Sequence, residues 1–381
     1  MHADPLIAGA ASRGGDLAAI DALIERQLIP QIIDIDRQAL YPADFLRALG
    51  ALGGFAGVVA PAHGGNGLGL RHTLDVMQAV SRQCLSSGFL VWCQTACARY
   101  LQLSCNEAAK AFWLPRIARG ETMAGTGLSN TMKSNDGIEN FRLSARRVAG
   151  GYEIDGTLPW VSNLGRDHVF VTGCPSDDGG MMFFLVDCAN TSVHLADCAH
   201  FAALDGTRTL ACRFRSTFIA DAEVLAHPDE GRAYLRRIKP GMILAQMGMG
   251  LGLVAGCVAL MHEANRQLAH VNRYLDDQVG DIEAALADAH ERTHALAETL
   301  ACEPLADVVP EILRLRAAGS ELALRAANAA MLHQGARGYL MRSPAQRRLR
   351  EAYFVAIVTP ALKHLRREIA QLQAADAGLA A

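Results

Sequence analysis

The sequence lacks any strong excess of charge of one sign. Its 36 Lys and Arg residues and 39 Asp and Glu residues leave a net charge of −3 at pH 7, and the pI is near 6.5. Such a chain has no broad electrostatic field for nucleic acid or an anionic membrane, so we expect neither as a partner. Disorder is also excluded, because 51% of the residues are hydrophobic and 20% are charged. The length of 381 residues suits two or three domains.

Two further absences concern the cell compartment and metals. The ten Cys residues have no disulfide-framework spacing, and the N-terminus lacks the regions of a signal peptide. Both predict a reduced, cytoplasmic protein. Cys93 and Cys97 lie one helical turn apart without further ligands nearby, so we interpret them as buried thiols and expect no metal site.

One long hydrophobic run passes a crude test for a membrane helix. In residues 242–261, Gln246 is the only clearly polar side chain, and basic residues precede the run. The alternative is a fully buried helix of a bundle. We favour the buried helix, because no second span exists and a series of glycines suits close helix packing. These glycines are Gly248, Gly250, Gly252 and Gly256.

A stretch of strand pattern interrupts an otherwise helical sequence. Phe141, Leu143 and Ala145 alternate with polar residues, Gly150 and Gly151 supply a turn, and the alternation resumes after them. This pattern predicts a β-hairpin. Helical periodicity is expected over 16–35, 42–51, 70–86, 88–105, 106–118 and from about 230 onward, and further strands over 168–172, 181–186 and 209–218.

Three segments carry a family resemblance. Residues 127–136 are similar to a "T-E-P-x-x-G-S-D" loop, residues 151–163 to "G-Y-x-L-N-G-x-K-x-W-I-T-N" strands, and residues 335–366 to a "G-G-x-G-Y-x-x-x-x-P-x-x-R-x-x-R-D" segment. All three motifs are those of the acyl-CoA dehydrogenase superfamily, and weaker matches extend over nearly the whole chain. The resemblance implies a mostly α, α+β fold with an N-terminal helical domain (1–121), a middle β-barrel domain (122–229) and a C-terminal four-helix bundle (230–381). It also implies a homodimer or homotetramer.

The resemblance further implies a flavin site. In the family the first two of these segments hold the flavin ring of FAD against an acyl thioester, and a flat apolar ring with a polar edge needs an aromatic wall, backbone donors and hydroxyls. The adenosine side departs from the family, with Leu332 and Ala336 at a Gln and a Gly position. FMN, or reduced flavin from a partner, therefore stays open beside FAD. The matching cofactor-binding positions are Leu128, Ser129, Trp160, Val161, Ser162 and Gly335, and Asn135 is the candidate for substrate binding.

The family's catalytic base has no counterpart. Thr359, followed by Pro360, stands where the family has the Glu that removes the α-proton of the thioester. A threonine hydroxyl is no base at neutral pH without an activating neighbour. The alternative base position, at the start of the central helix, is also empty, since residues 239–261 contain no carboxylate.

The sequence leaves three functions open within this resemblance. The first, which we prefer, is a flavin-dependent oxidoreductase acting on an acyl-CoA or carrier-bound thioester with a non-standard base, for which His333 and His364 are candidates. The second is a flavin-dependent monooxygenase of the same fold that receives reduced flavin from a reductase. The third is the silent subunit of a heteromer with a catalytic paralogue. Fatty acid or secondary metabolism is the expected setting.

A function of a different class rests on one motif. His290-Glu291-Arg292-Thr293-His294 reads H-E-x-x-H on a helical segment, the pattern of a zinc protease. A third ligand would be needed, and Glu298 and Glu311 are the candidates in the sequence. The surrounding residues are charged and Ala-rich, so we favour a solvated helix surface.

Overall fold

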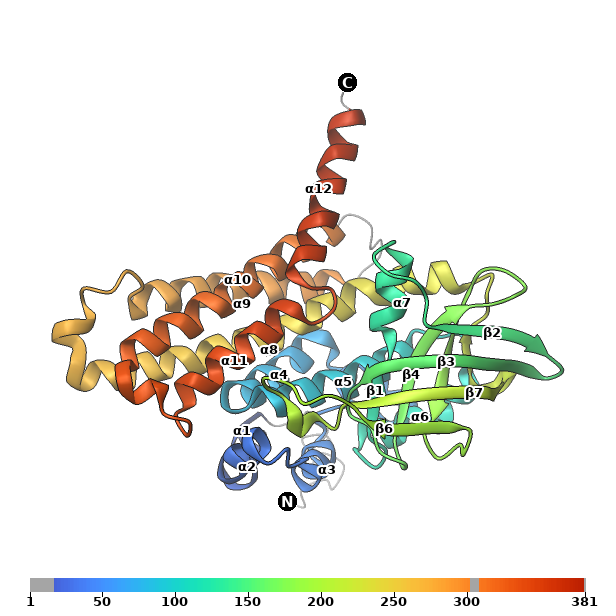
Figure 1. Ribbon diagram of the computed structural model, residues 1–381, viewed down its shortest axis with the longest axis horizontal. Coiled ribbons are helices and arrows are strands. Elements are labelled where there is room, and N and C mark those ends of the chain that lie inside the picture. The colour runs from blue at the N-terminus through green and yellow to red at the C-terminus, as the bar shows by residue number, and fades with distance from the viewer. Residues whose placement is uncertain (1–16, 302–307, 380–381) are drawn as a thin grey trace, which may run out of the picture.

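Helices and strands are arranged in three blocks along the chain. The computed structural model describes residues 17–301 and 308–379, and strands occupy only its middle block (Figure 1). The last N-terminal helix ends at Ala118 and the first strand begins at Ala124, while the last strand ends at Ala226 and the next helix begins at Gly231. The predicted mostly helical α+β fold is confirmed. The domain limits stay a prediction, because the first and third blocks share one hydrophobic core.

One of the N-terminal helices is buried on all sides. Residues 85–102 form this helix, α5, and its Cys93 and Cys97 are both fully buried. Burial raises the pKa of both thiols, so they stay protonated at neutral pH, which confirms their interpretation as core residues. The helices are α1 (Leu17–Leu23), α2 (Ile32–Arg37), α3 (Ala43–Ala51), α4 (Gly69–Gln83), α5 (Leu85–Gln102) and α6 (Glu107–Ala118).

The middle block consists of two four-stranded sheets. Their strand orders are β1-β4-β5-β8 and β2-β3-β7-β6, with a separate hydrophobic cluster between them and isolated bridges at Thr126↔Ser162 and Ala145↔Ser176. The expected barrel is thus present in an open form. The predicted hairpin is β2 and β3, and Gly150 makes its turn with a φ of 77°. The strands are β1 (Ala124–Thr126), β2 (Leu143–Val148), β3 (Gly151–Val161), β4 (Val169–Pro175), β5 (Met181–Asp187), β6 (Val193–Asp197), β7 (Leu210–Ala220) and β8 (Val224–Ala226).

One segment that resembles a loop motif is a helix. Residues 128–135 form α7 (Leu128–Asn135), directly after β1. Thr131 and Ser134 stand where the motif has Pro and Gly, so neither helix-breaking residue is present. Leu128 and Met132 lie one turn apart and are both buried, which fixes the helix against the sheet.

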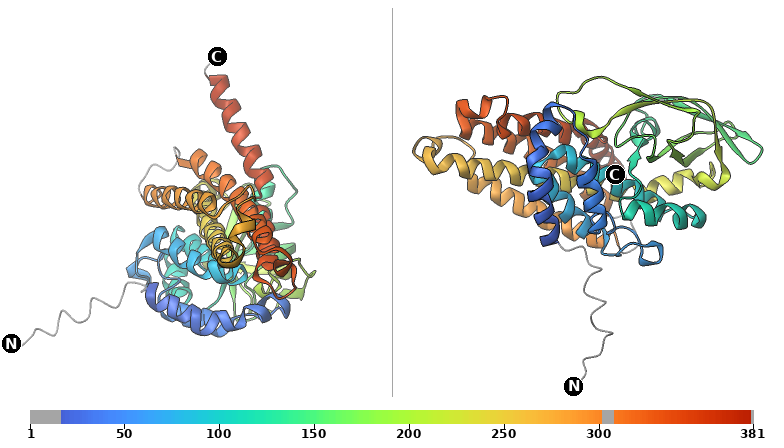
Figure 2. Two further views of the ribbon diagram at one scale, coloured as in Figure 1. Left: turned by 90° about the vertical axis from the view of Figure 1, so that its left-hand side faces the viewer. Right: turned by 90° about the horizontal axis from the view of Figure 1, so that it is seen from below.

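The C-terminal helices pack around one long helix. α8 runs from Gly231 to Asn272 and contacts α4, α9, α10 and α11; Figure 2 (left) looks along this bundle. Beyond it, α12 projects away from the bundle (Figure 1). The helices that follow α8 are α9 (Val279–Thr299), α10 (Val309–Gln334), α11 (Pro344–Ile357) and α12 (Leu362–Leu379), with a short 3₁₀ segment, η7 (Gly335–Tyr339), after α10.

The glycines of α8 allow it to approach α4 closely. A Cβ at position 252 would lie 2.5 Å from the carbonyl oxygen of Gln78, and one at position 256 would lie 2.7 Å from that of Arg82. The apolar window of α8 is long enough to cross a membrane, yet 89% of it is buried inside the protein. The run therefore forms a core helix of the bundle, as favoured from the sequence.

We expect Gly252→Val to lower the thermal midpoint by several degrees. The added side chain would collide with the α4 backbone, and overpacking of this kind costs about 1–3 kcal/mol. Differential scanning calorimetry measures the change. Gly280→Ala on α9 is the control, since a Cβ there meets nothing within 4 Å and should leave the midpoint unchanged or higher. Equal midpoints for the two variants would contradict this account of the packing.

Candidate functional site

Two candidate residues from distant parts of the sequence meet in the structure. The Oγ of Ser129, in the first turn of α7, shares a hydrogen bond of 2.8 Å with Oγ1 of Thr359, although 230 residues separate them. Thr359 lies in the connection between α11 and α12 and is half-buried. Thr359, at the position of the family's catalytic base, therefore lies next to Ser129, one of the expected flavin-binding residues.

Trp160 presents an open aromatic surface. The side chain is 59% exposed, and its ring meets Phe201 edge-on with 6.1 Å between centroids. Leu128 and Val161 are instead buried in the two hydrophobic clusters, so only their backbone groups remain for a ligand. A large exposed indole is costly in water, which makes it a suitable wall for a flat apolar ring.

Hydroxyl groups line the end of β3 next to this indole. Ser162 Oγ and Thr209 Oγ1 lie 2.7 Å apart, and Thr209 Oγ1 is also 2.9 Å from Thr207 Oγ1. A hydroxyl carries one donor and two acceptor positions, so this row of three hydroxyls can bind a further polar group. Ser162 is thus placed to meet the polar edge of a ring that lies on Trp160.

A buried hydrogen-bond network from the core of the bundle binds the backbone of Thr359. Gln246 on α8 donates from Nε2 to the Thr359 carbonyl oxygen at 2.8 Å, and its Oε1 accepts from Arg316 Nε at 2.9 Å. Arg316 on α10 also donates to the Val355 carbonyl oxygen at 2.6 Å and to Ser320 Oγ. Its side chain is 1% exposed, and burial lowers the pKa of Arg316 to about 10, so it remains charged at neutral pH. The hydrogen-bond network of Gln246 and Arg316 therefore fixes the position of the Thr359 loop.

Sequence reasoning missed Arg316 and gave Gln246 no role. The one available signal was that Gln246 is the only clearly polar side chain in an apolar run, since a buried amide needs hydrogen-bond partners. Nothing in the sequence marked Arg316, because its partners come from three different helices.

The two histidine candidates for a base are not placed for that role. His333 is fully buried, with Nε2 2.9 Å from the Asp277 carbonyl oxygen and Nδ1 3.2 Å from Asn265 Oδ1. His364 begins α12, and its Nδ1 accepts from the Ala361 backbone N–H at 3.3 Å. Burial lowers the pKa of His364, so it is neutral at pH 7, but its basic nitrogen is occupied. The hydrogen bond recorded for the Thr359 hydroxyl is to Ser129, not to a carboxylate.

Charged residues surround the last turn of α7. Lys239 on α8 lies 3.3 Å from Asp136 Oδ2 and 2.9 Å from Glu368 Oε1, and Arg367 donates to the Asp136 carbonyl oxygen at 2.8 Å. Asn135 is exposed beside them and donates to Asp136 Oδ1 at 3.0 Å. Asn135 is therefore free to meet the polar part of a long substrate.

Gly335 is the site residue that the fold does not bring to the others. It ends α10 with a φ of 57°, and Thr359 follows the opposite end of α11, whose 14 residues span about 20 Å. Exposed apolar side chains gather close to Gly335 in the sequence: Tyr339, Leu340 and Met341 are 82%, 64% and 62% exposed. Within one chain, Gly335 is separate from the ring site.

Known proteins share the sequence pattern and the fold. Residues 17–121 match the family model "Acyl-CoA dehydrogenase, N-terminal domain". The human mitochondrial short-chain specific acyl-CoA dehydrogenase is 23% identical over 345 residues, which covers 87% of this chain and 83% of that protein.

Solved structures share the fold over most of the chain. A glutaryl-coenzyme A dehydrogenase in complex with glutaryl-CoA superposes with a TM-score of 0.86 at 18% identity, over 94% of each chain. FMN-bound TdsC from Paenibacillus sp. A11-2 gives a TM-score of 0.81 at 16% identity, over 93% of this chain and 96% of that one.

We expect Gln246→Leu to destabilise the protein by about 2–3 kcal/mol. The change leaves Arg316 Nε and the Thr359 carbonyl oxygen without these partners, and buried groups that lose a charged hydrogen bond carry the full desolvation cost. Urea unfolding followed by circular dichroism measures the loss. Gln371→Leu, on the exposed face of α12, is the matched control and should be neutral. An unchanged unfolding midpoint for Gln246→Leu would show that the hydrogen bonds of Gln246 do not stabilise the Thr359 loop.

Proposed function

Because the chain belongs to the acyl-CoA dehydrogenase superfamily, we propose that it is a flavin-dependent oxidoreductase acting on an acyl thioester, either acyl-CoA or carrier-bound, without a glutamate base. The observation that carries the proposal is the contact of Ser129 with Thr359, since it joins the expected flavin segment to the expected catalytic segment.

The residues around Trp160 fit a flavin ring. The exposed indole offers the apolar wall, and the hydroxyls of Ser129 and Ser162 offer polar contacts of the kind that a ring edge needs. A bound flavin would supply hydride acceptance, or oxygen chemistry when reduced. The chain's own part is to position the ring and thioester and to exclude water. FAD is our first choice of cofactor and FMN the alternative.

A largely buried arginine indicates where the acyl group ends. Arg99 on α5 packs against Gly241 of α8, where a Cβ would lie 2.3 Å from the guanidinium Nε. This Nε has no hydrogen-bond partner in the described part of the chain, and burial lowers the pKa of Arg99. An uncompensated buried cation is unfavourable and favours an anionic ligand.

The space next to Arg99 is small. A cavity of about 10 Å³ is lined by Arg99, Met242 and Ala245, and Gln246, the next residue on α8, holds the Thr359 loop. That volume admits about one water molecule. We therefore propose a short acyl group with a carboxylate at its distal end as the substrate class.

Two alternative functions depend on the missing base. The Thr359 hydroxyl and the absence of a carboxylate from residues 239–261 favour chemistry that removes no α-proton. A monooxygenase that uses reduced flavin from a reductase meets this condition, and so does the silent subunit of a heteromer. The exposed apolar residues after Gly335 support assembly with a second chain, which we propose to be a further copy in a dimer or tetramer.

Thr359→Glu should create acyl-CoA dehydrogenase activity. The new carboxylate would occupy the family's base position next to Ser129, and proton removal by a positioned base is worth about 100- to 10,000-fold. The measurement is the visible spectrum of the purified, flavin-loaded variant, in which added acyl-CoA should bleach the flavin. Thr359→Gln has the same size without the base and should stay inactive.

The possible outcomes distinguish the three functions proposed for the site. Bleaching by Thr359→Glu supports thioester and flavin binding at this site. A folded variant that holds flavin but gives no bleaching with any acyl-CoA would contradict the thioester proposal and favour the monooxygenase. A wild-type chain that takes up neither oxidised nor reduced flavin would favour the silent subunit.

Arg99→Met should reverse the preference among thioesters. Loss of a charged hydrogen bond is expected to weaken binding of glutaryl-CoA by about 10- to 100-fold, while butyryl-CoA, which has no distal carboxylate, should bind equally well or better. Perturbation of the flavin spectrum in a titration measures both affinities. Arg236→Met, on the exposed face of α8, is the control and should change neither. An equal loss for both ligands would contradict the placement of the acyl end at Arg99.

A further inference from the structure

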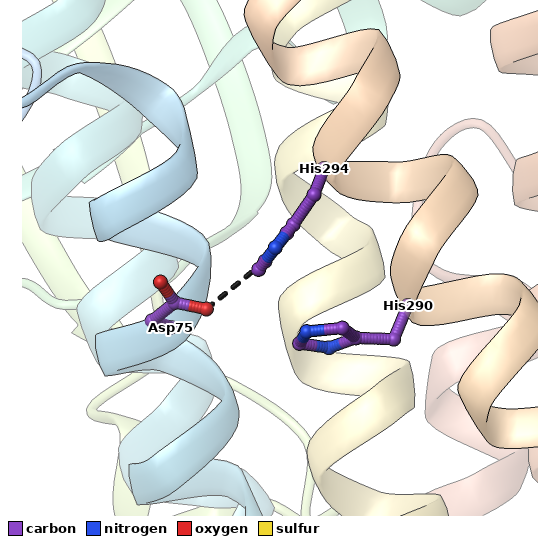
Figure 3. Close-up of side chains that lie close together, drawn as sticks. All are labelled: Asp75, His290 and His294. Atoms are coloured by element: carbon purple, nitrogen blue, oxygen red, sulfur yellow. Dashed lines mark ion pairs between the residues drawn. The ribbon is translucent and has the colours of Figure 1, made fainter.

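Three side chains that can bind a metal converge between α4 and α9. His290 and His294 lie one turn apart on α9, and Asp75 faces them from α4 (Figure 3). One ligand atom from each of the three lies within 4.8 Å of the others. The two helices come from opposite halves of the sequence, so only the tertiary fold forms this group.

His294 has a buried nitrogen without a hydrogen bond. The residue is 9% exposed, and its Nε2 has no hydrogen-bond partner within residues 17–301 and 308–379. Asp75 Oδ1 lies only 2.9 Å from this atom, but the direction between the two groups does not meet hydrogen-bond geometry. An imidazole nitrogen directed at a carboxylate is suited to share a cation with it.

His290 is oriented by a neighbouring amide. Its Nδ1 lies 3.0 Å from Gln78 Oε1, which accepts the Nδ1 hydrogen and leaves Nε2 with its lone pair. A hydrogen bond on one ring nitrogen is the usual way in which proteins fix a metal-binding histidine. Gln78 lies one turn after Asp75 on α4, so the same helix supplies a ligand and the residue that positions another.

A groove gives solvent access to the cluster. It has a volume of about 500 Å³ between α4, α8 and α9, and Gln78 and His290 line it together with His262 and Glu283. His262 and Glu283 pair with each other at 2.7 Å and belong to a separate contact. Of the three residues, His290 lines the groove, so an ion with its bound water would approach the cluster from the His290 side.

We propose that Asp75, His290 and His294 bind a divalent transition metal ion of the zinc type that ties α4 to α9. Two imidazoles and one carboxylate form a donor set that such ions accept, whereas Mg²⁺ and Ca²⁺ prefer oxygen ligands alone. Ligand atoms around tetrahedral zinc are roughly 3.3 Å apart, given bond lengths of about 2.0–2.2 Å. Small side-chain rotations would bring the three atoms to that spacing.

This site is distinct from the zinc protease motif considered in the sequence. Both sequence candidates for the third ligand are occupied, Glu298 by Arg71 and Glu311 by Arg292. Glu291, which would serve as the general base, is exposed. Asp75 replaces them as third ligand, and the ion's role is to join the N-terminal and C-terminal helices. The prediction of no metal site weighed only ligands near the motif, whereas Asp75 is more than 200 residues away in the sequence.

Titration of the untagged full-length protein with Zn²⁺ tests the proposal. After removal of metals by dialysis against a chelator, calorimetry should give about one Zn²⁺ per chain with a dissociation constant in the micromolar range or lower, and Mg²⁺ should give no binding. Bound zinc should also raise the thermal midpoint by a few degrees, since it stabilises only the folded state. Co²⁺ should give the visible absorption of a nitrogen- and oxygen-coordinated site in flavin-free protein, and Zn²⁺ should abolish it.

Variants assign the binding to the three residues. Asp75→Asn, His290→Gln and His294→Gln should each weaken Zn²⁺ binding by about 100-fold or more, and Gln78→Leu by about 10- to 100-fold. His262→Gln, which lines the same groove, is the matched control and should bind like the wild type. Stoichiometric binding that these variants leave unchanged, an equal loss in His262→Gln, or no zinc binding by the wild-type chain would overturn the proposal. If a variant fails to fold, the Co²⁺ spectrum of the wild type still tests whether a metal ion binds through nitrogen and oxygen ligands.

Discussion

The close packing of α8 against α4 is the constraint on which the rest of the structure depends. It is possible because positions 252 and 256 carry no Cβ where the α4 carbonyl oxygens approach. Elsewhere along α8, Gly241 packs against Arg99 of α5, and Gln246 binds the Thr359 carbonyl oxygen between α11 and α12. On α4 itself, Asp75 meets His294 of α9. The two helices of this contact therefore each carry residues that support one of the two proposed sites.

Buried polar groups distinguish the supporting parts of the molecule from those that face a ligand. Arg316 is fully buried and finds acceptors on Gln246, Ser320 and Val355, so its charge is used within the fold. Arg99 and His294 each carry a buried nitrogen without a hydrogen bond in the part of the chain that the structure describes. Burying such a group without a partner is unfavourable, and a ligand that supplies the partner recovers the loss. This physical argument underlies both the proposed substrate class and the proposed metal ion.

Much of the fold could be predicted from local patterns. Alternation around Gly150 predicted the hairpin, and the apolar run with its glycines predicted the core helix, because each signal lies within one element. Two features were not predicted in full. Residues 128–135 form a helix, since Thr131 and Ser134 replace the Pro and Gly of the motif, and the strands form two sheets, since strand pairing depends on contacts distant in the sequence.

The sequence by itself determined the types of residue available for chemistry: Trp160 and Ser162 at the end of a strand, Thr359 where a glutamate is usual, and two histidines one turn apart. Only the tertiary structure decided which of them meet. It joined Ser129 to Thr359, left Gly335 at the far end of α11, and brought Asp75 to His290 and His294. Local periodicity specifies which face of a helix is buried but not which helix covers it, and that choice depends on how the whole core packs.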